Sequence, residues 1–191
     1  GFGPERETLA GVPHFADTVF SVRFPFARID FSDADGCCVP FPAKLALEAF
    51  NPFIPCNDAD SSLPAAFFEV EIENTRDEPI AYTVCFSLGN PHTARALNEP
   101  WSDDGLHGVR LSADGMPEDD MGYGALALAT DACDTSVQSY WYRGRWFDSL
   151  AMFWEDFTSN HVLHERTYAP LATNSADMTS LAAHITLGPG E

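Results

Sequence analysis

Residues 66–72 read AFFEVEI and residues 80–88 read IAYTVCFSL, and both stretches have a period of two. In each stretch, apolar side chains alternate with side chains that, except for Phe67, are polar or small, which is typical of a β-strand with one buried face. The side chains expected to point inward are Phe68, Val70, Ile72, Tyr82, Val84 and Phe86. Residues 74–79 between them, NTRDEP, are polar turn formers. The sequence therefore predicts one antiparallel hairpin.

Further strand candidates are short and are separated by clusters of Gly, Pro, Asp and Asn. They are Val19–Phe31, Ala43–Phe50, Val109–Ser112, Ala125–Thr130, Val137–Tyr142 and Leu181–Leu187. Many short strands separated by such turn-forming residues predict an all-β fold, an antiparallel β-sandwich. No internal repeat, low-complexity tract or linker interrupts the chain, so we expect residues 1–191 to form a single domain.

One segment near the C-terminal end has a helical period instead. Its large apolar residues recur on one side of a helix, and they are Trp146, Leu150, Phe153, Trp154 and Phe157. Asp148 is suited to the N-cap position. We predict a short amphipathic helix from about Asp148 to Phe157, packed on the sandwich by this aromatic stripe. An aromatic platform for a sugar, built from the same residues, is the alternative.

The charge of the chain limits its partners. It has 29 Asp and Glu residues against 10 Lys and Arg, a formal net charge of -19, which repels phosphate backbones and anionic headgroups. Its five cysteines include the adjacent Cys37 and Cys38, which are poorly placed to form a disulfide bond with each other. We find no glycosylation sequon, no leader pattern and no apolar run of about 20 residues that would span a membrane. These features favour free thiols and a cytoplasmic location.

Acidic pairs are numerous, but nothing in the sequence assembles them into a catalytic site. They are Asp33 with Asp35, Asp58 with Asp60, Asp103 with Asp104, and Glu118 with Asp119 and Asp120. A glycosidase needs two carboxyl groups held about 5 to 9.5 Å apart across a cleft, and neighbouring acids in turns do not specify that geometry. Because no triad order, metal-ligand spacing or phosphate-binding glycine motif accompanies them, we predict no catalytic residue, no metal and no cofactor.

Several motifs, in this order and spacing, resemble the N-terminal domain of glycoside hydrolase family 116, the non-lysosomal glucosylceramidase and β-glucosidase family. They are Phe24-Pro25-Phe26-Ala27, residues 47–55 (LEAFNPFIP), residues 60–66 (DSSLPAA), Asn98-Glu99-Pro100-Trp101, residues 146–157 and residues 187–191. The likeness covers nearly the whole chain.

The resemblance implies a supersandwich-like β-sandwich that is not itself catalytic and that buttresses a helical catalytic domain. It also implies that residues 1–191 end before the last strands of the sandwich and before a C-terminal (α/α)6 catalytic domain. Members of the family hydrolyse β-glucosides, including glucosylceramide, with retention, and their two catalytic carboxyl groups belong to that C-terminal domain. The expected role is therefore in carbohydrate metabolism, with no catalytic residue in these 191 residues.

Residues 90–124 contain much Gly, Pro and Asp with little strand periodicity, and long loops in compact domains are often functional. Within this stretch we expect Asn98, Glu99 and Trp101 to contact the catalytic domain or the rim of its cleft, where β-glucosides would bind. A local loop core around Trp101 is the alternative. Two other functions stay open: a carbohydrate-binding module that stacks sugars on Trp101, Trp141 or Trp146, and a free-standing hydrolase.

Overall fold

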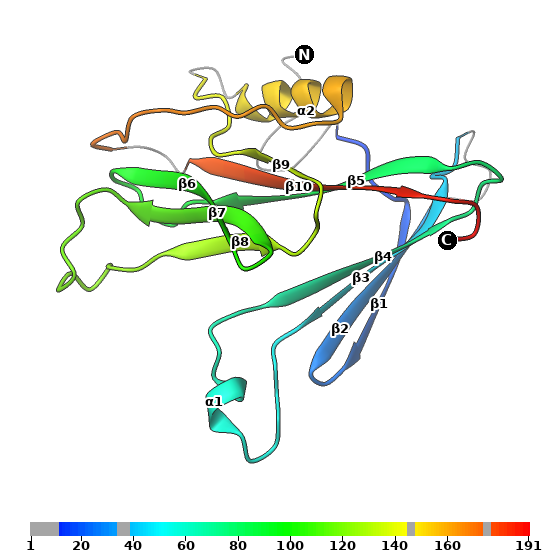
Figure 1. Ribbon diagram of the computed structural model, residues 1–191, viewed down its shortest axis with the longest axis horizontal. Coiled ribbons are helices and arrows are strands. Elements are labelled where there is room, and N and C mark those ends of the chain that lie inside the picture. The colour runs from blue at the N-terminus through cyan, green and yellow to red at the C-terminus, as the bar shows by residue number, and fades with distance from the viewer. Residues whose placement is uncertain (1–11, 34–38, 145–147, 174–176) are drawn as a thin grey trace. The chain divides into compact units, whose positions relative to one another are not determined.

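The structure is a computed structural model that describes residues 12–33, 39–144, 148–173 and 177–191 (Figure 1). Within these ranges the chain is built mostly from strands in antiparallel sheets, with one short and one longer helix. The predicted all-β, antiparallel sandwich class is therefore confirmed. Outside the described residues lie Cys37, Cys38 and Trp146.

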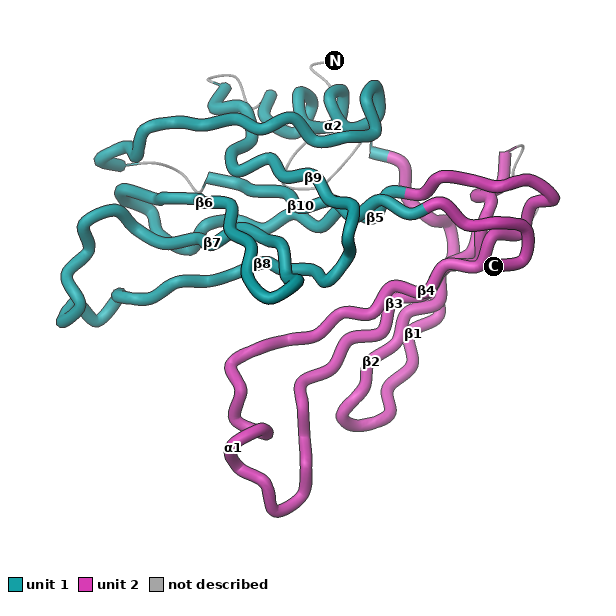
Figure 2. The backbone as a smooth tube through the Cα atoms, viewed as in Figure 1, with its two compact units in different colours: residues 1–12, 83–185 teal, residues 13–82, 186–191 magenta. Residues whose placement is uncertain are grey.

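The chain forms two compact units (Figure 2). Apart from the gaps just named, unit 1 comprises residue 12 and residues 83–185, and unit 2 comprises residues 13–82 and 186–191. The following paragraphs describe each unit by itself.

Unit 2 is built on one four-stranded sheet whose strands pair in chain order: β1 (Asp17–Arg23), β2 (Phe26–Ser32), β3 (Ala43–Phe50) and β4 (Phe67–Asn74). Residues that pair across strands share a face of the sheet, and alternate residues along a strand do so too. The register therefore sorts the side chains into two faces with opposite character.

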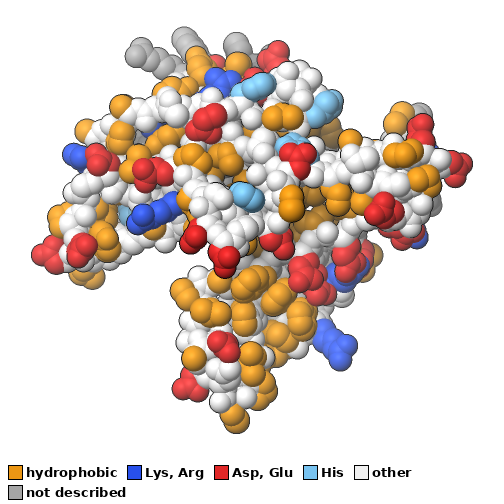
Figure 3. All heavy atoms as spheres, viewed as in Figure 1, with side chains coloured by type: hydrophobic (Ala, Val, Ile, Leu, Met, Phe, Trp, Pro, Cys, Tyr) orange, Lys and Arg blue, Asp and Glu red, His pale blue; other side chains and the backbone are white. Residues whose placement is uncertain are grey.

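We call the first of these the apolar face. It comprises Phe20 and Val22 of β1; Ala27, Ile29 and Phe31 of β2; Leu45, Leu47 and Ala49 of β3; and Phe68, Val70 and Ile72 of β4, with Thr18 at its end. Phe20 is 65% exposed, Phe68 50% and Val70 39%. In Figure 3 hydrophobic side chains gather over the lower part of unit 2.

The opposite face of the same sheet is charged. Arg28 donates to Asp30 at 3.0 Å and to Glu71 at 2.7 Å, and Lys44 donates at 2.7 Å to Glu73, its cross-strand partner. The hydrogen bond from Arg28 to Glu71, together with the positive charge of the guanidinium, lowers the pKa of the Glu71 carboxyl group. These groups are exposed, except for Arg28, which is half-buried, so each ion pair contributes little to stability, typically ~0–1 kcal/mol. The main effect of these charged side chains is to define which face of the sheet is exposed to solvent.

The end of β4 is fixed by the buried side chain of Asn74. Its amide nitrogen lies 2.9 Å from the carbonyl oxygen of Glu78 and 3.0 and 3.1 Å from those of Leu187 and Gly188. Its carbonyl oxygen accepts from the Arg76 backbone at 2.9 Å and from the Tyr82 hydroxyl at 3.2 Å. One side chain thus joins the end of β4, the following turn and the last residues of the chain.

The predicted hairpin between residues 66–72 and 80–88 is wrong. Both segments are strands, but β4 pairs with β3, whereas β5 (Ile80–Gly89) pairs with β10 (Met178–Leu187) in another sheet. The alternation was read correctly for β4, because Phe68, Val70 and Ile72 do share a face. The side chains of both strands were expected to be buried in one core. Tyr82 is buried, but Phe68, Val70 and Phe86 are exposed.

The stretch Val19–Phe31, expected as one strand, is the hairpin β1–β2, which reverses at Phe24-Pro25. Residues 51–66, which carry part of the family likeness, form the connection from β3 to β4 and include the four-residue helix α1 (Asp58–Ser61). Asn57 caps α1 by accepting from Asp60 N, and the Asn51 side chain donates to the carbonyl oxygen of Ala65 at 2.6 Å. These contacts give the motif a structural role.

Unit 1 contains two three-stranded sheets. One has the order β5–β10–β9, where β9 is Thr135–Gln138, and the other has the order β6 (Ala96–Asp103), β7 (Leu106–Ala113) and β8 (Leu126–Thr130). Helix α2 (Ser149–Asn160) lies on the β5–β10–β9 sheet (Figure 1). Asp148 occupies the predicted N-cap position, but its side chain makes no capping hydrogen bond, and the helix ends three residues later than expected.

The core of unit 1 forms where α2 meets this sheet. Buried Trp141, which follows β9, stacks on Phe153 of α2 with ring centroids 4.3 Å apart and planes 9° from parallel. The Trp141 indole N–H donates to Ser180 Oγ of β10 at 2.7 Å, and Leu150, Leu163 and Ala182 complete the buried cluster. The aromatic stripe of the helix therefore packs the core, as predicted.

No helix in the described ranges is long and apolar enough to cross a membrane. The described cysteines Cys56, Cys85 and Cys133 are free thiols, and burial raises the pKa of Cys85 to about 11.

We predict that Phe153→Ala destabilises the chain by about 3–5 kcal/mol, because it removes a buried ring and leaves a cavity against Trp141. Chemical denaturation followed by tryptophan fluorescence measures this change. Met121→Ala, a truncation at a fully exposed position of the same unit, is the control and should stay within about 0.5 kcal/mol of the wild type. Equal effects of the two substitutions would contradict the assigned core.

Candidate functional site

The residues 98–101, expected in a loop, lie in strand β6. The hairpin β6–β7 reverses over two residues, Asp104 with φ 46° and Gly105 with φ 81°. Two positive φ angles in succession are typical of a type I′ turn, for which Asp-Gly is a favoured pair. The Asp104-Gly105 dipeptide was therefore the sequence signal that could have revealed this hairpin.

The register of β6, β7 and β8 defines two faces. The inner face includes Asn98, Val109 and Leu111, which are buried. The opposite side we call the outer face. It has three rows of cross-strand partners: Leu97 with Ser112; Glu99 with Arg110 and Ala127; and Trp101 with Gly108 and Ala129.

Asn98 is held inside unit 1. Its side chain donates to the carbonyl oxygen of Ser139 at 2.7 Å and accepts from the side chain of Asn90 at 2.8 Å. Its backbone N–H donates to the Tyr140 hydroxyl at 2.9 Å, and burial raises the pKa of that hydroxyl. Asn98 therefore fixes β6 against the segment after β9 and has no exposed surface to offer a ligand.

Glu99 and Trp101 lie beside Asn98 in sequence but on the outer face. Glu99 is exposed and is the cross-strand partner of Arg110, whereas Trp101 is half-buried and faces Gly108. A side chain at Gly108 would meet the carbonyl oxygen of Leu128 at 2.2 Å, so only glycine fits opposite the indole. The structure thus separates the three predicted residues into one internal residue and two on the surface.

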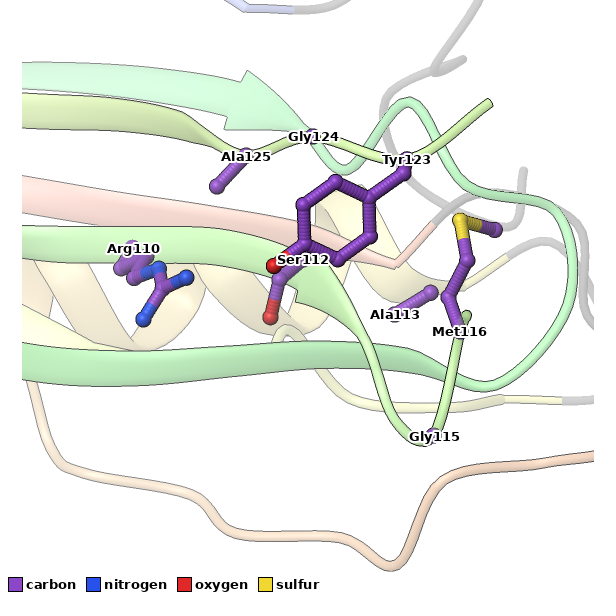
Figure 4. Close-up of a pocket in the computed structure, with 8 residues that line it drawn as sticks. All are labelled: Arg110, Ser112, Ala113, Gly115, Met116, Tyr123, Gly124 and Ala125. Carbon is purple, nitrogen blue, oxygen red and sulfur yellow. The ribbon is translucent and has the colours of Figure 1, made fainter. Parts of the chain in front are cut away.

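A pocket with a volume of about 260 Å³ lies at one end of the outer face. Its walls are Arg110, Ser112 and Ala113 of β7, Gly115 and Met116 of the turn that follows, and Tyr123, Gly124 and Ala125 before β8. Figure 4 shows the ring of Tyr123 extending from its loop toward the strand that carries Ser112 and Arg110. Sequence reasoning had missed Arg110, Ser112 and Tyr123.

Short-range hydrogen bonds hold the loop that carries Tyr123. The Tyr123 N–H donates to the carbonyl oxygen of Asp120 at 2.9 Å, and the Gly122 N–H donates to the Asp120 carboxylate at 2.7 Å. Beside the other wall, Arg95 Nε donates at 2.6 Å to the carbonyl oxygen of Asp114, which lies between the lining residues Ala113 and Gly115. Both walls of the pocket are therefore fixed by local contacts.

The pocket has an unusual charge arrangement. The side chain of Arg110 is exposed and makes no hydrogen bond or ion pair with another residue in the described ranges, although this chain is strongly acidic. None of the eight residues that line the pocket is Asp or Glu. The arrangement offers a guanidinium, a hydroxyl and an aromatic ring to a ligand but no carboxyl group for acid–base catalysis.

The other tryptophans considered as sugar platforms have different positions. Trp141 is a buried core residue, so it cannot serve as an exposed platform. Trp146 lies outside the described residues. Among the residues that the structure does describe, no group of three or more His, Cys, Asp or Glu could hold a metal ion.

Comparison with known protein families gave one finding. The family described as beta-glucosidase 2, glycosyl-hydrolase family 116 N-term, matches residues 7–191. The resemblance inferred from the motifs is thereby confirmed. No curated protein matches the chain.

We predict that Asn98→Ala destabilises the chain by about 1–3 kcal/mol, because the Ser139 carbonyl and the Asn90 amide would lose a buried partner. Urea denaturation measures the loss. Glu99→Ala, the adjacent exposed position, is the matched control and should change the free energy of unfolding by less than about 0.5 kcal/mol. If Asn98→Ala were as mild as Glu99→Ala, the structural role of Asn98 would be wrong.

Proposed function

Because the chain belongs to glycoside hydrolase family 116 as an N-terminal domain, we propose that it is a non-catalytic domain that buttresses the hydrolytic domain of its parent protein. The parent is a retaining β-glucosidase, with glucosylceramide among its candidate substrates, and it acts in carbohydrate metabolism in the cytoplasm. The free described cysteines support a reducing compartment. We also propose that the two compact units of residues 1–191 act together as one domain.

The apolar face of unit 2 carries the buttressing proposal. Soluble proteins rarely expose a large continuous apolar patch unless another protein surface covers it. Here the face contains no charged residue, and its large side chains include Phe20 and Val70, which are exposed in this chain. A sheet with one charged and one apolar side is built to receive a second layer on the apolar side. We assign that layer to the remainder of the parent chain.

The chemistry of the site supports a non-catalytic role. A glycosidase acid needs a pKa that is raised, so that it stays protonated near neutral pH. The pocket beside Arg110 has no carboxyl group in its walls that could fill this role. We propose that Glu99 and Trp101 contact the rim of the catalytic cleft, and that Asn98 positions them by fixing strand β6.

Phe20→Asp tests the buttressing role in the full parent protein. We predict that it lowers the melting temperature by several degrees, because it places a charge in an apolar interface. Ser21→Asp is the matched control, since it adds the same charge one residue away on the charged face. The two variants add the same charge to opposite faces of the sheet. Equal melting temperatures for both variants would overturn the assignment of the interface.

Catalysis is tested on the 191-residue chain with an aryl β-glucoside. We predict no turnover above the buffer rate, because no residue of this chain is proposed as nucleophile or acid. Release of the aryl group is followed by absorbance, and the full parent protein serves as the positive control. Turnover that disappeared on replacing a single Asp or Glu of this chain would show that the domain is itself a hydrolase.

A further inference from the structure

A second apolar surface of unit 2 lies at one end of its sheet, where the β1–β2 turn and the loop that contains α1 are found (Figure 1). We call it the aromatic tip, and it comprises Phe24, Phe26, Phe50, Phe53 and Phe67. The Phe50 ring lies 5.2 Å from that of Phe26 and 5.3 Å from that of Phe67, measured between centroids. Phe24 and Phe53 meet edge to face at 5.0 Å, although they are 75% and 53% exposed. The tip is therefore built from packed rings that still face solvent.

The aromatic tip is separate from the apolar face that supports the buttressing role. Phe26, Phe50 and Phe67 are cross-strand partners in one row. Because alternate residues of a strand lie on one face, this row shares the face of the sheet that carries Arg28 and Glu71. The charged face thus ends in a row of aromatic rings, and this row needs a reason of its own.

Polar contacts hold the loop of the aromatic tip in one conformation. The Ser61 hydroxyl accepts from the Ile54 N–H at 3.0 Å and donates to the Ile54 carbonyl oxygen at 3.1 Å. The Asn57 N–H donates to the same carbonyl oxygen at 3.0 Å and closes a turn. The side chains of Phe53 and Ile54 nevertheless stay exposed. A loop that is already ordered loses less conformational entropy on binding, which is typical of a preformed protein interface.

The charges beside the aromatic tip favour a protein partner over a lipid surface. Asp58 and Asp60 of α1 are exposed in the same loop as Phe53, and moving these carboxylates into a bilayer would be costly. An apolar centre with a polar rim is instead the usual composition of a protein interface. The acidic rim also predicts basic residues around the apolar pocket of the partner.

We infer that the aromatic tip is a second, separate contact with the catalytic domain of the parent protein, where Phe24 and Phe53 enter an apolar pocket with a basic rim. That domain is the partner because the chain belongs to its family as an N-terminal domain, and a partner tethered in the same chain has a high effective concentration. The inference rests on the proposed function for the presence of that domain. It adds an anchor at the loop end of the sheet.

Alkylation of Cys56 in the full parent protein tests whether the aromatic tip is covered. Cys56 is a free, exposed thiol in the turn between Ile54 and Asn57, and Cys133 of unit 1 is free and exposed as well. Both react with N-ethylmaleimide, and peptide mass spectrometry gives the rate at each thiol relative to its rate in the urea-unfolded protein. We expect Cys56 to be protected about tenfold or more. Cys133, the internal control, should react at close to its unfolded rate.

Phe24→Asp and Phe53→Asp should each remove this protection, because a charge weakens an apolar contact. Cys56 should then react at close to its unfolded rate. Met121→Asp is the matched control, since it adds the same charge at a fully exposed position of unit 1, and it should leave Cys56 protected. Circular dichroism verifies the fold of each variant.

A Cys56 that reacts as fast as Cys133 in the wild-type parent would overturn the inference. Protection that appears only after phosphatidylcholine vesicles are added would assign the tip to a membrane, and protection that rises with protein concentration would assign it to a second copy. Either result would also overturn it. Failure of the proposed function is recognised separately. A freely reactive Cys56 beside a lowered melting temperature for Phe20→Asp would remove the tip contact and leave the buttressing role in place.

Discussion

The buried amide of Asn74 is the contact on which the arrangement of unit 2 depends. It satisfies carbonyl groups from the turn after β4 and from the end of β10, and it accepts hydrogen bonds from Arg76 and Tyr82. An unpaired buried polar group is costly, so each of these segments has to keep its place for the amide to be satisfied. In the folded chain the residues after 74 do not pair with β4, and β5 pairs with β10 instead.

Features that depend on local sequence were predictable here. The spacing of Leu150, Phe153 and Phe157 determines which side of α2 packs the core, and the alternation in residues 66–72 identifies the two faces of β4 correctly. The pairing of β4 with β3 was not predictable in the same way. Alternation shows which side of a strand is apolar, but it does not show which other strand pairs with it. The hydrogen bonds of Asn74 form only once the fold has brought its partners together.

The candidate site was predictable only in part. Residues 98–101 were expected in a loop, and the structure places them in the edge strand β6, where proline is tolerated. Their different roles follow from the period of two, which turns Asn98 inward and Glu99 and Trp101 outward. Arg110, Ser112 and Tyr123 carry no motif of their own. They become a site only because the β7 register and a separate loop bring them together.

The apolar face also determines how conditions act on any layer that covers it. Because no ion pair can form on that face, cohesion there depends on the release of water from hydrocarbon surface. Such an interface responds weakly to ionic strength, and its formation has a large negative heat-capacity change. The interface becomes less stable on cooling, because apolar hydration becomes less unfavourable at low temperature. A protein assembled through this sheet would therefore be loosened by cold and largely indifferent to salt.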